Sequence, residues 1–529
     1  MSDRNEILEQ LTDADLDVLV AGGGVVGAGI ARDAAMRGLR VGLAEQYDLA
    51  FGTSSRSTRL LHGGLRYLAQ GHLGLVYQSS REKKIVHGIA PHLSRPLPII
   101  FPTYRRTQWP FWKLRIGVKI YDLVCGGRNL GPSYGLSAGE VLLRAPGLKP
   151  YDLTGGVQFY DSQSNDARLV IDTLRSAAGH GAIICNYLRL ETAFPGKNGW
   201  ECHLRDTLTD QVHKIFARTV VNACGPWAAK LPHSSLRLRL TKGVHLVIDR
   251  QRLNLPDAVM VTEGQRTMFV FPWGDRAILG STDTDYDGPL DDVRTEPDDA
   301  RYVLDVINRN FPEAKLTPAD ILSTWAGLRP LIDTGRGGPS DISRAHQIHM
   351  PEPGWLDVAG GKLTTYRLIG EEVVDRVVKH LGKKVEPCRT AEEPLSERFE
   401  SGAMATLAWP CGLKDSTDLK SNSQHAHDER GHGTKTDSTS RIESGILPPP
   451  VCREVVEHYC KNEWAVHLDD VMIRRTSWHY YLDNPIETAQ QVAAWMGECC
   501  VWDVPRKDEE LSRYRRQVEI DTACRNTDI

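Results

Sequence analysis

The stretch VLVAGGGVVGAG, residues 18–29, decides how the N-terminal part of this 529-residue chain folds. Gly22, Gly24 and Gly27 satisfy the pattern G-x-G-x-x-G directly after an apolar run. In this pattern the first glycine permits a tight turn and the second lets backbone approach a pyrophosphate. The third lets helix and strand pack closely, so that the helix N-terminus faces the anion. The stretch therefore predicts a dinucleotide-binding turn.

The flanking residues indicate strand, turn, helix and second strand. Residues 17–21 are rich in β-branched types, 28–37 are rich in small types, and 39–45 form another apolar run. Glu45 ends the second run, eighteen residues after Gly27. An acid at this place can hold a ribose hydroxyl, whereas an arginine would favour a 2′-phosphate. NADP is therefore disfavoured, and NAD and FAD both remain.

The next block, FGTSSRSTRLLHGGLRYL (residues 51–68), separates these two cofactors. NAD-binding units usually continue into another plain βαβ repeat at this point. A hydroxyl-rich segment suits a longer, extended cofactor, whose second phosphate and isoalloxazine ring need further donors. A plain polar loop is the alternative. The block favours FAD.

Composition limits the classes of protein. The chain has 64 basic and 68 acidic residues and a net charge of −4, which argues against nucleic acid as a partner. It is 41% hydrophobic and 25% charged, as ordinary globular proteins are, and its length predicts three or four domain-sized units. Eleven cysteines without a C-x-x-C pair are typical of reduced cytosolic thiols, and no metal site is predicted.

Targeting signals are not expected. The acidic N-terminus MSDRNEILEQLTDADLD has no apolar core of the kind that a secretory signal needs. The longest uncharged stretch, residues 18–31, is shorter than the roughly 20 apolar residues of a membrane-spanning helix.

Short apolar runs alternate with helical patterns over much of the chain, which indicates an α/β protein with antiparallel strands where runs follow each other directly. The runs are 182–185, 219–222, 245–248 and 268–271, and the helical patterns are 167–178 and 298–310.

Residues 414–445 form a polar segment with no aromatic residue and three aliphatic ones. Such a segment cannot bury enough surface to offset the entropy of ordering, so a flexible linker or insertion is predicted. Its histidines, His425, His427 and His432, are interpreted as solvated residues. From residue 446 onward the pattern predicts a small helical domain, with one helix at 487–499.

Seven motifs occur in order along the chain: GGGVVGAGIARDAAMRG, TSSRSTRLLHGGLRYL, VNACGPWA, KGVHLVI, PWGDRAILGSTDTDY, AGLRPL and GGKLTTYR. Together, over roughly residues 17–380, they resemble the FAD-dependent glycerol-3-phosphate dehydrogenase family of the aerobic, respiratory type. The region after 446 is similar more weakly, through LDDVMIRRT (residues 468–476).

The resemblance implies an α/β fold with a Rossmann-like FAD-binding domain, an antiparallel-sheet substrate domain of the D-amino-acid-oxidase type, and a C-terminal helical domain. The expected ranges are 1–90, 151–225 and 326–385 for FAD binding, 91–150 and 226–325 for the substrate or cap domain, and 446–529 for the helical domain.

The resemblance also implies a reaction. Enzymes of this family oxidise sn-glycerol 3-phosphate to dihydroxyacetone phosphate by hydride transfer from C2 to flavin N5, and pass the electrons to quinone. They attach peripherally to the cytoplasmic membrane and often form homodimers.

Site residues follow from the resemblance, motif by motif. The expected FAD contacts are Gly22, Gly24, Gly27, Glu45, Thr53, Ser54, Ser55, Ala223, Gly225, Gly361, Leu363 and Thr364. The expected substrate contacts are Arg66, Tyr67, Arg329 and Lys362, with His245 nearby. The chain departs from the family at Cys224, where threonine is commoner, and at Arg59, where lysine is commoner.

The expected substrate suits these cations. A phosphomonoester carries a charge between about −1.5 and −2 near neutral pH, and arginine binds phosphate oxygens bidentately. Arg329 or Lys362 would stabilise a developing alkoxide. His245 is the candidate base because imidazole accepts a proton near pH 7. A packed, hydrogen-bonded histidine is the alternative, and His62 is a rival base.

Residues 104–128 combine basic side chains with the aromatic residues Trp109, Phe111, Trp112 and Tyr121. A basic helix that carries interfacial aromatics is typical of a membrane-surface anchor. The alternative is a helix that packs its aromatics in the core while its lysines reach solvent.

Three other functions stay open at this stage. Two are enzymes of the same fold, an oxidase that reduces oxygen and a relative that acts on an amine. An amine substrate fits poorly, because two arginines and a lysine suit a phosphate better than one carboxylate. The third, a flavin-binding module without activity, is disfavoured because all three cations are present.

Overall fold

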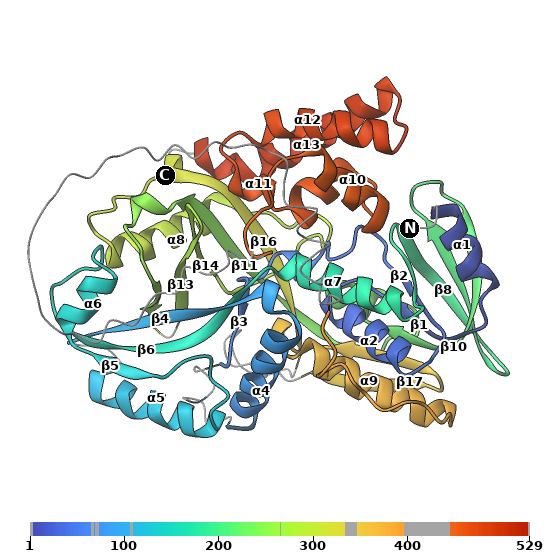
Figure 1. Ribbon diagram of the computed structural model, residues 1–529, viewed down its shortest axis with the longest axis horizontal. Coiled ribbons are helices and arrows are strands. Elements are labelled where there is room, and N and C mark those ends of the chain that lie inside the picture. The colour runs from blue at the N-terminus through green and yellow to red at the C-terminus, as the bar shows by residue number, and fades with distance from the viewer. Residues whose placement is uncertain are drawn as a thin grey trace, which may run out of the picture.

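The computed structural model describes residues 4–64, 68, 73–105, 109–264, 266–333, 346–395 and 445–526. Arg66, Tyr67 and positions 414–444 of the predicted linker lie outside the described residues. Two large sheets are surrounded by helices, and a further helical group lies at one end of the molecule (Figure 1). The predicted α/β class is confirmed.

The first sheet contains the Rossmann unit that the glycine motif predicts. Its parallel strands lie in the order β18 (Trp355–Ala359), β10 (Val212–Asn222), β1 (Leu16–Ala21), β2 (Val41–Ala44) and β7 (Ile183–Cys185). Antiparallel strands are added by β17 (Gln347–Glu352), β8 (Leu188–Gly196) and β9 (Gly199–Asp206).

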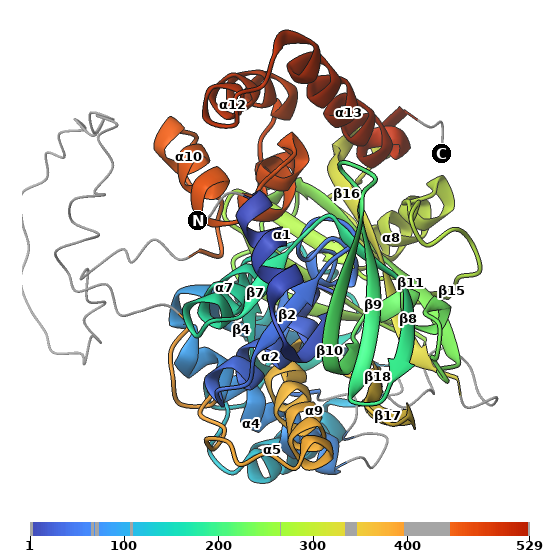
Figure 2. The same cartoon turned by 90° about the vertical axis from the view of Figure 1, so that its right-hand side faces the viewer.

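Helices cover both faces of this sheet (Figure 2). On one face lie α2 (Val25–Met36), α7 (Asp166–Gly179) and α9 (Tyr366–Leu381), and on the other lies α1 (Arg4–Asp13). The small residues of α2 allow close packing: a Cβ at Gly29 would lie 2.9 Å from the Tyr366 carbonyl oxygen of α9. This packing holds the first turn of α2 in place below the glycine loop.

The second sheet is antiparallel apart from the β12–β4 pair. Its order is β15 (Thr284–Asp285), β11 (Leu238–Asp249), β14 (Arg276–Gly280), β13 (Arg266–Trp273), β12 (Ala258–Glu263), β4 (Ser94–Tyr104), β6 (Leu153–Ser164) and β3 (Leu60–Leu61). In addition, β16 (Ile321–Ile332) pairs with β11, and β5 (Tyr134–Leu136) pairs with β6.

Residues of β11 alternate between two cores, as period-two strands do. Val244 and Leu246 pack with α8 (Pro297–Asn310), whereas Val247 packs with Trp273 and Trp325. The remaining helices beside this sheet are α4 (Leu73–Ile89), α5 (Phe111–Cys125) and α6 (Ala138–Arg144). Short 3-10 turns are η1 (Thr53–Ser55), η2 (Pro91–Leu93), η3 (Gly225–Lys230), η4 (Arg250–Arg252), η5 (Pro318–Asp320), η6 (Leu363–Thr365) and η8 (Ala523–Asn526).

Strand pairing shifts two of the expected domain boundaries. β6 was expected in the FAD-binding range 151–225, but it pairs along its length with β4. β16 straddles the expected boundary at 326 and pairs with β11 throughout. Strand partners are distant in sequence, so a reading of local patterns could not assign these strands to a sheet.

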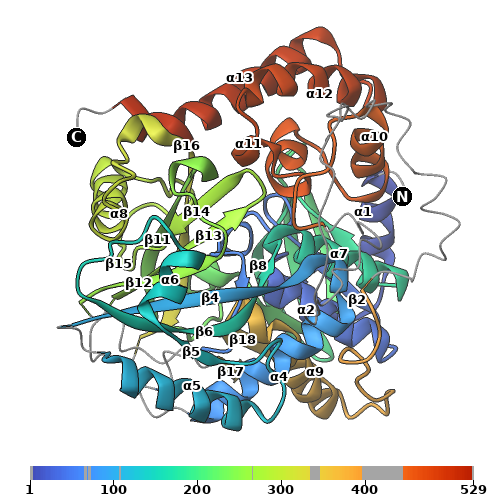
Figure 3. The ribbon, with the colours of Figure 1, turned by 60° about the vertical axis from the view of Figure 1, so that its left-hand side comes forward.

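The C-terminal residues form the predicted helical group, with a core of its own. It consists of α10 (Arg453–Asn462), the π-helical turn η7 (Asp470–Arg475), α11 (Trp478–Tyr481), α12 (Pro485–Cys499) and α13 (Val504–Thr522). Figures 1 and 3 show this group at one end of the molecule and α5 at the other.

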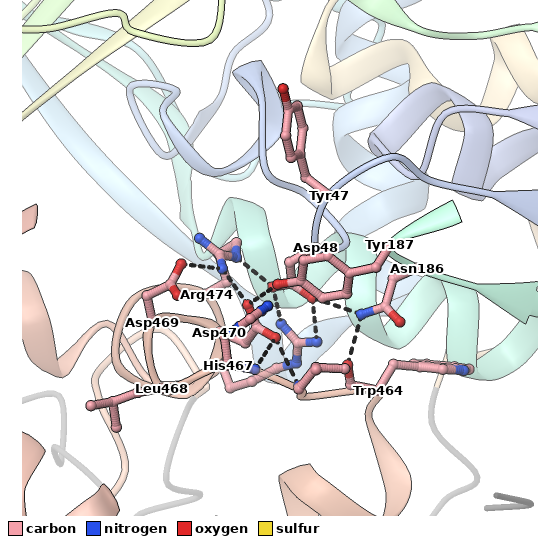
Figure 4. A network of polar contacts seen from close by, with 12 residues as sticks. Tyr47, Asp48, Asn186, Tyr187, Trp464, His467, Leu468, Asp469, Asp470 and Arg474 are labelled. Carbon is pink, nitrogen blue, oxygen red and sulfur yellow. Dashed lines mark hydrogen bonds and ion pairs between the residues drawn. The ribbon is translucent and has the colours of Figure 1, made fainter. Parts of the chain in front are cut away.

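A buried charge network joins the helical group to the first sheet (Figure 4). Asp48, just after β2, accepts two hydrogen bonds from Arg475, at 2.7 and 2.8 Å, and another from Arg474. Burial acts to raise the pKa of Asp48, but Arg475 and Arg474 outweigh it and hold this pKa below its usual range. The Tyr187 hydroxyl donates to Asp470 at 2.7 Å across the same interface.

A second buried arginine contact lies close to this network. Arg59, on the segment after η1, donates to the Ser477 hydroxyl at 3.1 Å. Its guanidinium also stands over the rings of Trp273, Trp325 and Tyr480, at 4.5, 5.1 and 5.8 Å from their centroids. The arginine found where the family more often has lysine therefore contributes to the docking of the helical group.

Asp48→Asn should destabilise this interface strongly. The change removes the carboxylate that pairs with the buried Arg475 and one of the three that pair with Arg474, a loss on the order of 3 to 5 kcal/mol. We expect a lower thermal midpoint of the FAD-bound enzyme, and earlier proteolytic release of the region after residue 445.

Asp15→Asn is the matched control. Asp15 also pairs with two arginines, Arg40 and Arg218, but its side chain is half exposed. Its loss should cost less than about 1 kcal/mol. Equal effects of the two substitutions would contradict the role given to Asp48.

Candidate active site

At three positions of the glycine loop the backbone is packed so closely that a side chain would crowd its neighbours. Gly22 has a φ of +112°, and a Cβ there would lie 2.5 Å from the Ala223 carbonyl oxygen. A Cβ on Gly24 would lie 3.2 Å from Ser54 Oγ, and one on Gly27 would overlap the carbonyl of Gly22. The loop leads directly into the N-terminus of α2. This bare backbone at a helix N-terminus fits a pyrophosphate.

Glu45 lies beside the loop at the end of β2. Its carboxylate accepts hydrogen bonds from the Gly23 amide at 2.6 Å and the Tyr47 amide at 2.9 Å. Burial raises the pKa of Glu45 to about 7, and these amide bonds offset only part of the effect. Each carboxylate oxygen has a second lone pair, so the group can also accept from ribose hydroxyls.

The turn after β10 faces the glycine loop. The Ala223 amide donates to the Ala21 carbonyl at 2.8 Å, and Gly225 has a φ of +55°. The Cys224 thiol donates to the same carbonyl at 3.3 Å, and burial raises its pKa. The thiol thus remains neutral and donates a hydrogen bond that a threonine hydroxyl could also donate.

The segment of residues 53–58 connects the loop to the second sheet. Ser54 Oγ accepts from the Val25 amide at 2.9 Å, at the start of α2. Thr53 donates to the Leu328 carbonyl of β16 at 2.5 Å, and the Thr58 hydroxyl lies 3.0 Å from His245 Nε2 on β11. Ser55, in the same turn, is buried. The hydroxyl-rich block therefore runs from the pyrophosphate end of the site to the strands that carry Arg329 and His245.

Arg329 is held on β16 in a fixed position. Its Nη1 donates to Asp283 and to the Thr282 carbonyl, both at 3.2 Å, and its Nη2 donates to Ser281 Oγ at 2.7 Å. The guanidinium lies over Gly243 of β11, where a Cβ would overlap it. The Arg329 guanidinium is thereby held beside Gly243, two residues before His245 on the same strand.

His245 is deeply buried, with 1% exposure, and stacks on Trp325 at a centroid distance of 5.2 Å. Burial, with Arg329 and Arg59 nearby, lowers the pKa of His245 well below its ordinary value. Nδ1 has no hydrogen-bond partner among the described residues. The imidazole is therefore neutral near pH 7.

Lys362 lies in the turn that precedes η6, whereas Arg329 lies on β16. Its Nζ donates to Ser79 Oγ of α4 at 3.2 Å. In the same turn Thr364 Oγ1 accepts from the His62 amide at 3.1 Å. The structure thus gathers the predicted residues into two groups, Arg329 with His245, and Lys362 with Thr364.

Two further predicted residues of this turn face the core. Gly361 has a φ of +82°, and a Cβ there would overlap the Ile369 side chain. Leu363 packs against the core of the first sheet. Their contact with a cofactor would therefore be made by backbone.

Sequence reasoning missed the buried charges that position these turns. Lys83 of α4 pairs with Asp161 of β6 at 3.0 Å, and the same carboxylate accepts from the Gly63 amide at 2.9 Å. Arg367 donates to both carboxylate oxygens of Glu82, at 2.7 and 2.9 Å. In sequence Lys83 and Glu82 look like ordinary exposed helix residues. The one local sign of a tightly held turn in this region of the sequence was the glycine pair after His62.

A dinucleotide loop joined to an antiparallel sheet that carries a fixed cation is the arrangement of a flavin enzyme. Residues 17–376 match the family described as FAD dependent oxidoreductase, and the chain belongs to this family. It is an enzyme, and its cofactor is FAD, which fits the bare glycine loop and Glu45.

Within that class the relatives are aerobic glycerol-3-phosphate dehydrogenases. The chain is 34% identical to that of Bacillus subtilis over 97% of its own length and 96% of the relative's. It is 39% identical to that of Staphylococcus aureus over 73% and 72% of the two chains. The glycerol-3-phosphate dehydrogenase of Bacillus halodurans, solved in complex with FAD, has a TM-score of 0.74 at 27% identity, over 98% and 97% of the chains. The family read from the motifs is confirmed.

FAD affinity should depend on pH through Glu45. The pKa of this carboxyl is about 7 without FAD, and ribose hydroxyls would donate to its ionised form. FAD binding therefore favours loss of the proton, so affinity should rise with pH up to about 7 and level off above it. Below pH 7 it should fall by up to about tenfold per unit, measured by reconstitution of FAD-free protein.

Glu45→Gln should weaken FAD binding at pH 8 and remove this dependence. Glu313→Gln, at an exposed position, should keep the wild-type profile. An unchanged pH profile in Glu45→Gln would show that another group binds the proton.

Proposed function

We propose that this enzyme oxidises sn-glycerol 3-phosphate to dihydroxyacetone phosphate, by transfer of a hydride from C2 to flavin N5, and that quinone receives the electrons. The named relatives support the substrate. The position of Arg329 carries the proposal: three protein oxygens orient its guanidinium over Gly243, two residues before His245 on β11.

The cations provide the phosphate site. Arg329 comes from β16 and Lys362 from the turn before η6, and Arg66 and Tyr67, outside the described residues, are proposed to complete the site. One cation at 4 Å from a unit of phosphate charge contributes about 4 kcal/mol at an effective dielectric of 20, before desolvation is subtracted. Such a pocket prefers a phosphomonoester to glycerol or to an amino acid.

The proton of the C2 hydroxyl needs an acceptor, and we propose His245. Bound FAD supplies the hydride acceptor. If His245 donates Nε2–H to Thr58, Nδ1 carries the lone pair that takes the proton. Arg329 would stabilise the developing alkoxide. Burial, with Arg329 and Arg59 nearby, lowers the pKa of His245 and keeps the imidazole neutral, so that it has a lone pair for the proton.

The reductive half-reaction tests the substrate. Under anaerobic conditions, glycerol 3-phosphate should bleach the flavin absorption, whereas glycerol and sarcosine should not. Reoxidation should be faster with a soluble quinone than with oxygen. Bleaching by sarcosine alone would overturn the substrate, and rapid reoxidation by oxygen would favour the oxidase.

Variants separate the proposed roles within the same half-reaction. Arg329→Ala should keep FAD and lose at least about 100-fold in kcat/KM, because one phosphate or alkoxide contact disappears. His245→Gln should slow bleaching at saturating substrate by about 100-fold or more, the contribution of a general base. Arg252→Ala, at an exposed arginine of η4, should match the wild type. Unchanged kinetics in either test variant would remove that residue from the mechanism.

We propose that α5 holds the enzyme at the surface of the cytoplasmic membrane. Four of its apolar side chains lie on one exposed face: Trp112 at 65%, Ile116 at 54%, Ile120 at 43% and Leu123 at 80%. Lys113, Arg115 and Lys119 are exposed beside them, as is suitable for anionic lipid.

The same helix corrects part of the sequence prediction. Tyr121 was counted among the interfacial aromatics, but it is fully buried, and Trp109, just before α5, packs against the core. Both alternatives thus hold for different faces of α5. In the described part of the chain, no helix has the length and apolar character needed to cross a bilayer.

Liposome co-sedimentation tests this face. Trp112→Ser combined with Leu123→Ser should reduce pelleting with anionic vesicles by about tenfold or more, because roughly 200 Å² of apolar contact is lost. Phe194→Ser, on exposed β8, is the control and should pellet as the wild type does. Equal pelleting of all three proteins would refute the anchor.

A further inference from the structure

Three cysteines that are scattered in sequence meet in the C-terminal helical group. Cys460 lies near the end of α10, Cys499 is the last residue of α12, and Cys500 follows it. Their sulfur atoms all lie within 4.8 Å of one another. Among the described residues, this is the one cluster of three or more histidine, cysteine or acidic side chains with metal-binding spacing.

The end of α12 makes this convergence possible. Adjacent side chains on a regular helix point about 100° apart, so neighbouring cysteines normally diverge. Here the helix ends between them: Cys500 has φ −101° and ψ 6°, and Val501 has a φ of +56°. The amides of Cys500 and Trp502 donate back to Met496 and Gly497, at 2.7 and 2.9 Å, and fix the turn.

The partner helix is fixed as well. Arg453 at the start of α10 pairs with Glu498 of α12 at 2.7 Å. The two helices share a core in which Val456 and Val492 are fully buried. The three thiols are thus carried by a packed scaffold, although all three remain partly exposed to solvent.

We propose that Cys460, Cys499 and Cys500 form a binding site for a thiophilic metal ion such as Zn²⁺, with a fourth position open to water. A Zn–S bond of about 2.3 Å places sulfurs about 3.8 Å apart in a tetrahedral site, within reach of small side-chain rotations. Thiolates select Zn²⁺ or Cu⁺ over harder cations. This site lies outside the active site, and it departs from the expectation of reduced thiols without a metal site.

The site would strengthen the docking of the helical group. Glu463, three residues after Cys460, is fully buried and pairs with Arg168 of α7 at 2.5 Å. A metal that ties the end of α10 to α12 would hold Glu463 in position. A metal ion that binds the native state but not the unfolded state raises the stability of the native state.

Metal retention by the FAD-bound enzyme tests the site. The protein is reduced with a phosphine, treated with a chelator, and then equilibrated with Zn²⁺ or, without oxygen, with Cu⁺. After buffer exchange, the wild type should retain one ion per chain by elemental mass spectrometry, and its thermal midpoint should rise. Alkylation should spare these three cysteines once the ion is bound. The two metal arms show which ion the site prefers.

Cys460→Ser and Cys500→Ser should each bind at least about 100-fold more weakly, since a lost ligand costs more than a lost outer-shell partner. Cys452→Ser, at the start of α10, is the matched control and should bind as the wild type does. FAD content and thermal midpoint without metal confirm that each variant is folded.

Other results overturn the proposal. Retention of neither metal by the reduced wild type would do so, as would equal retention by Cys460→Ser, Cys500→Ser and Cys452→Ser. A cross-link between two of these cysteines on mild oxidation, without any metal binding, would instead identify a thiol–disulfide pair.

Discussion

The buried contact of Asp48 with Arg474 and Arg475 is the constraint on which the site depends most. Asp48 lies three residues after Glu45, so it fixes the chain just beyond the acid expected at the ribose. Arg59 fixes the other end of the same segment through Ser477 and the aromatic rings around it. The helical group therefore clamps residues 45–59 at both ends.

These contacts at both ends also fix the position of the site residues that lie between them on the segment. Between its two ends lie the hydroxyls of Thr53 and Ser54, and Thr58, which meets His245. A buried ion pair of this kind adds little net stability compared with apolar packing, but removal of one partner is costly. The network is thus better understood as a device that selects one arrangement of the segment. It also gives a physical reason for the motif LDDVMIRRT, whose two arginines are the ones that reach Asp48.

Local patterns in the sequence predicted much of this structure. The glycine turn, β1, α2 and β2 follow from spacing alone, and α7, α8 and α12 lie within one or two residues of the predicted helices. These elements depend on short-range periodicity and on turn chemistry. Arg329 and Lys362 were identified through motif resemblance, because nothing in their local sequence distinguishes them from surface cations.

The features that could not be predicted are those that depend on distant partners. The assignment of β6 and β16 to the second sheet rests on strand pairing, and the Lys83–Asp161 pair joins a helix to a strand 78 residues away. The cysteine cluster needs the end of α12 to turn toward α10. In each case the side chains are ordinary in sequence, and only the tertiary fold brings their charges or sulfurs together.

The positions of the two ends of the molecule relate the site to the proposed membrane surface. α5 lies at the end opposite the helical group, yet its buried face reaches the site: Tyr121 of α5 occupies the space that a Cβ on Gly63 would need. Gly63 belongs to the turn beside Lys362. The Gly63 amide donates to Asp161, which in turn pairs with Lys83. The turn at His62 thus packs against α5, and residues 45–59 are held by contacts with the helical group. Substrate would bind between a membrane-facing layer and a clamping layer, and each layer would fix one of the two groups of catalytic candidates.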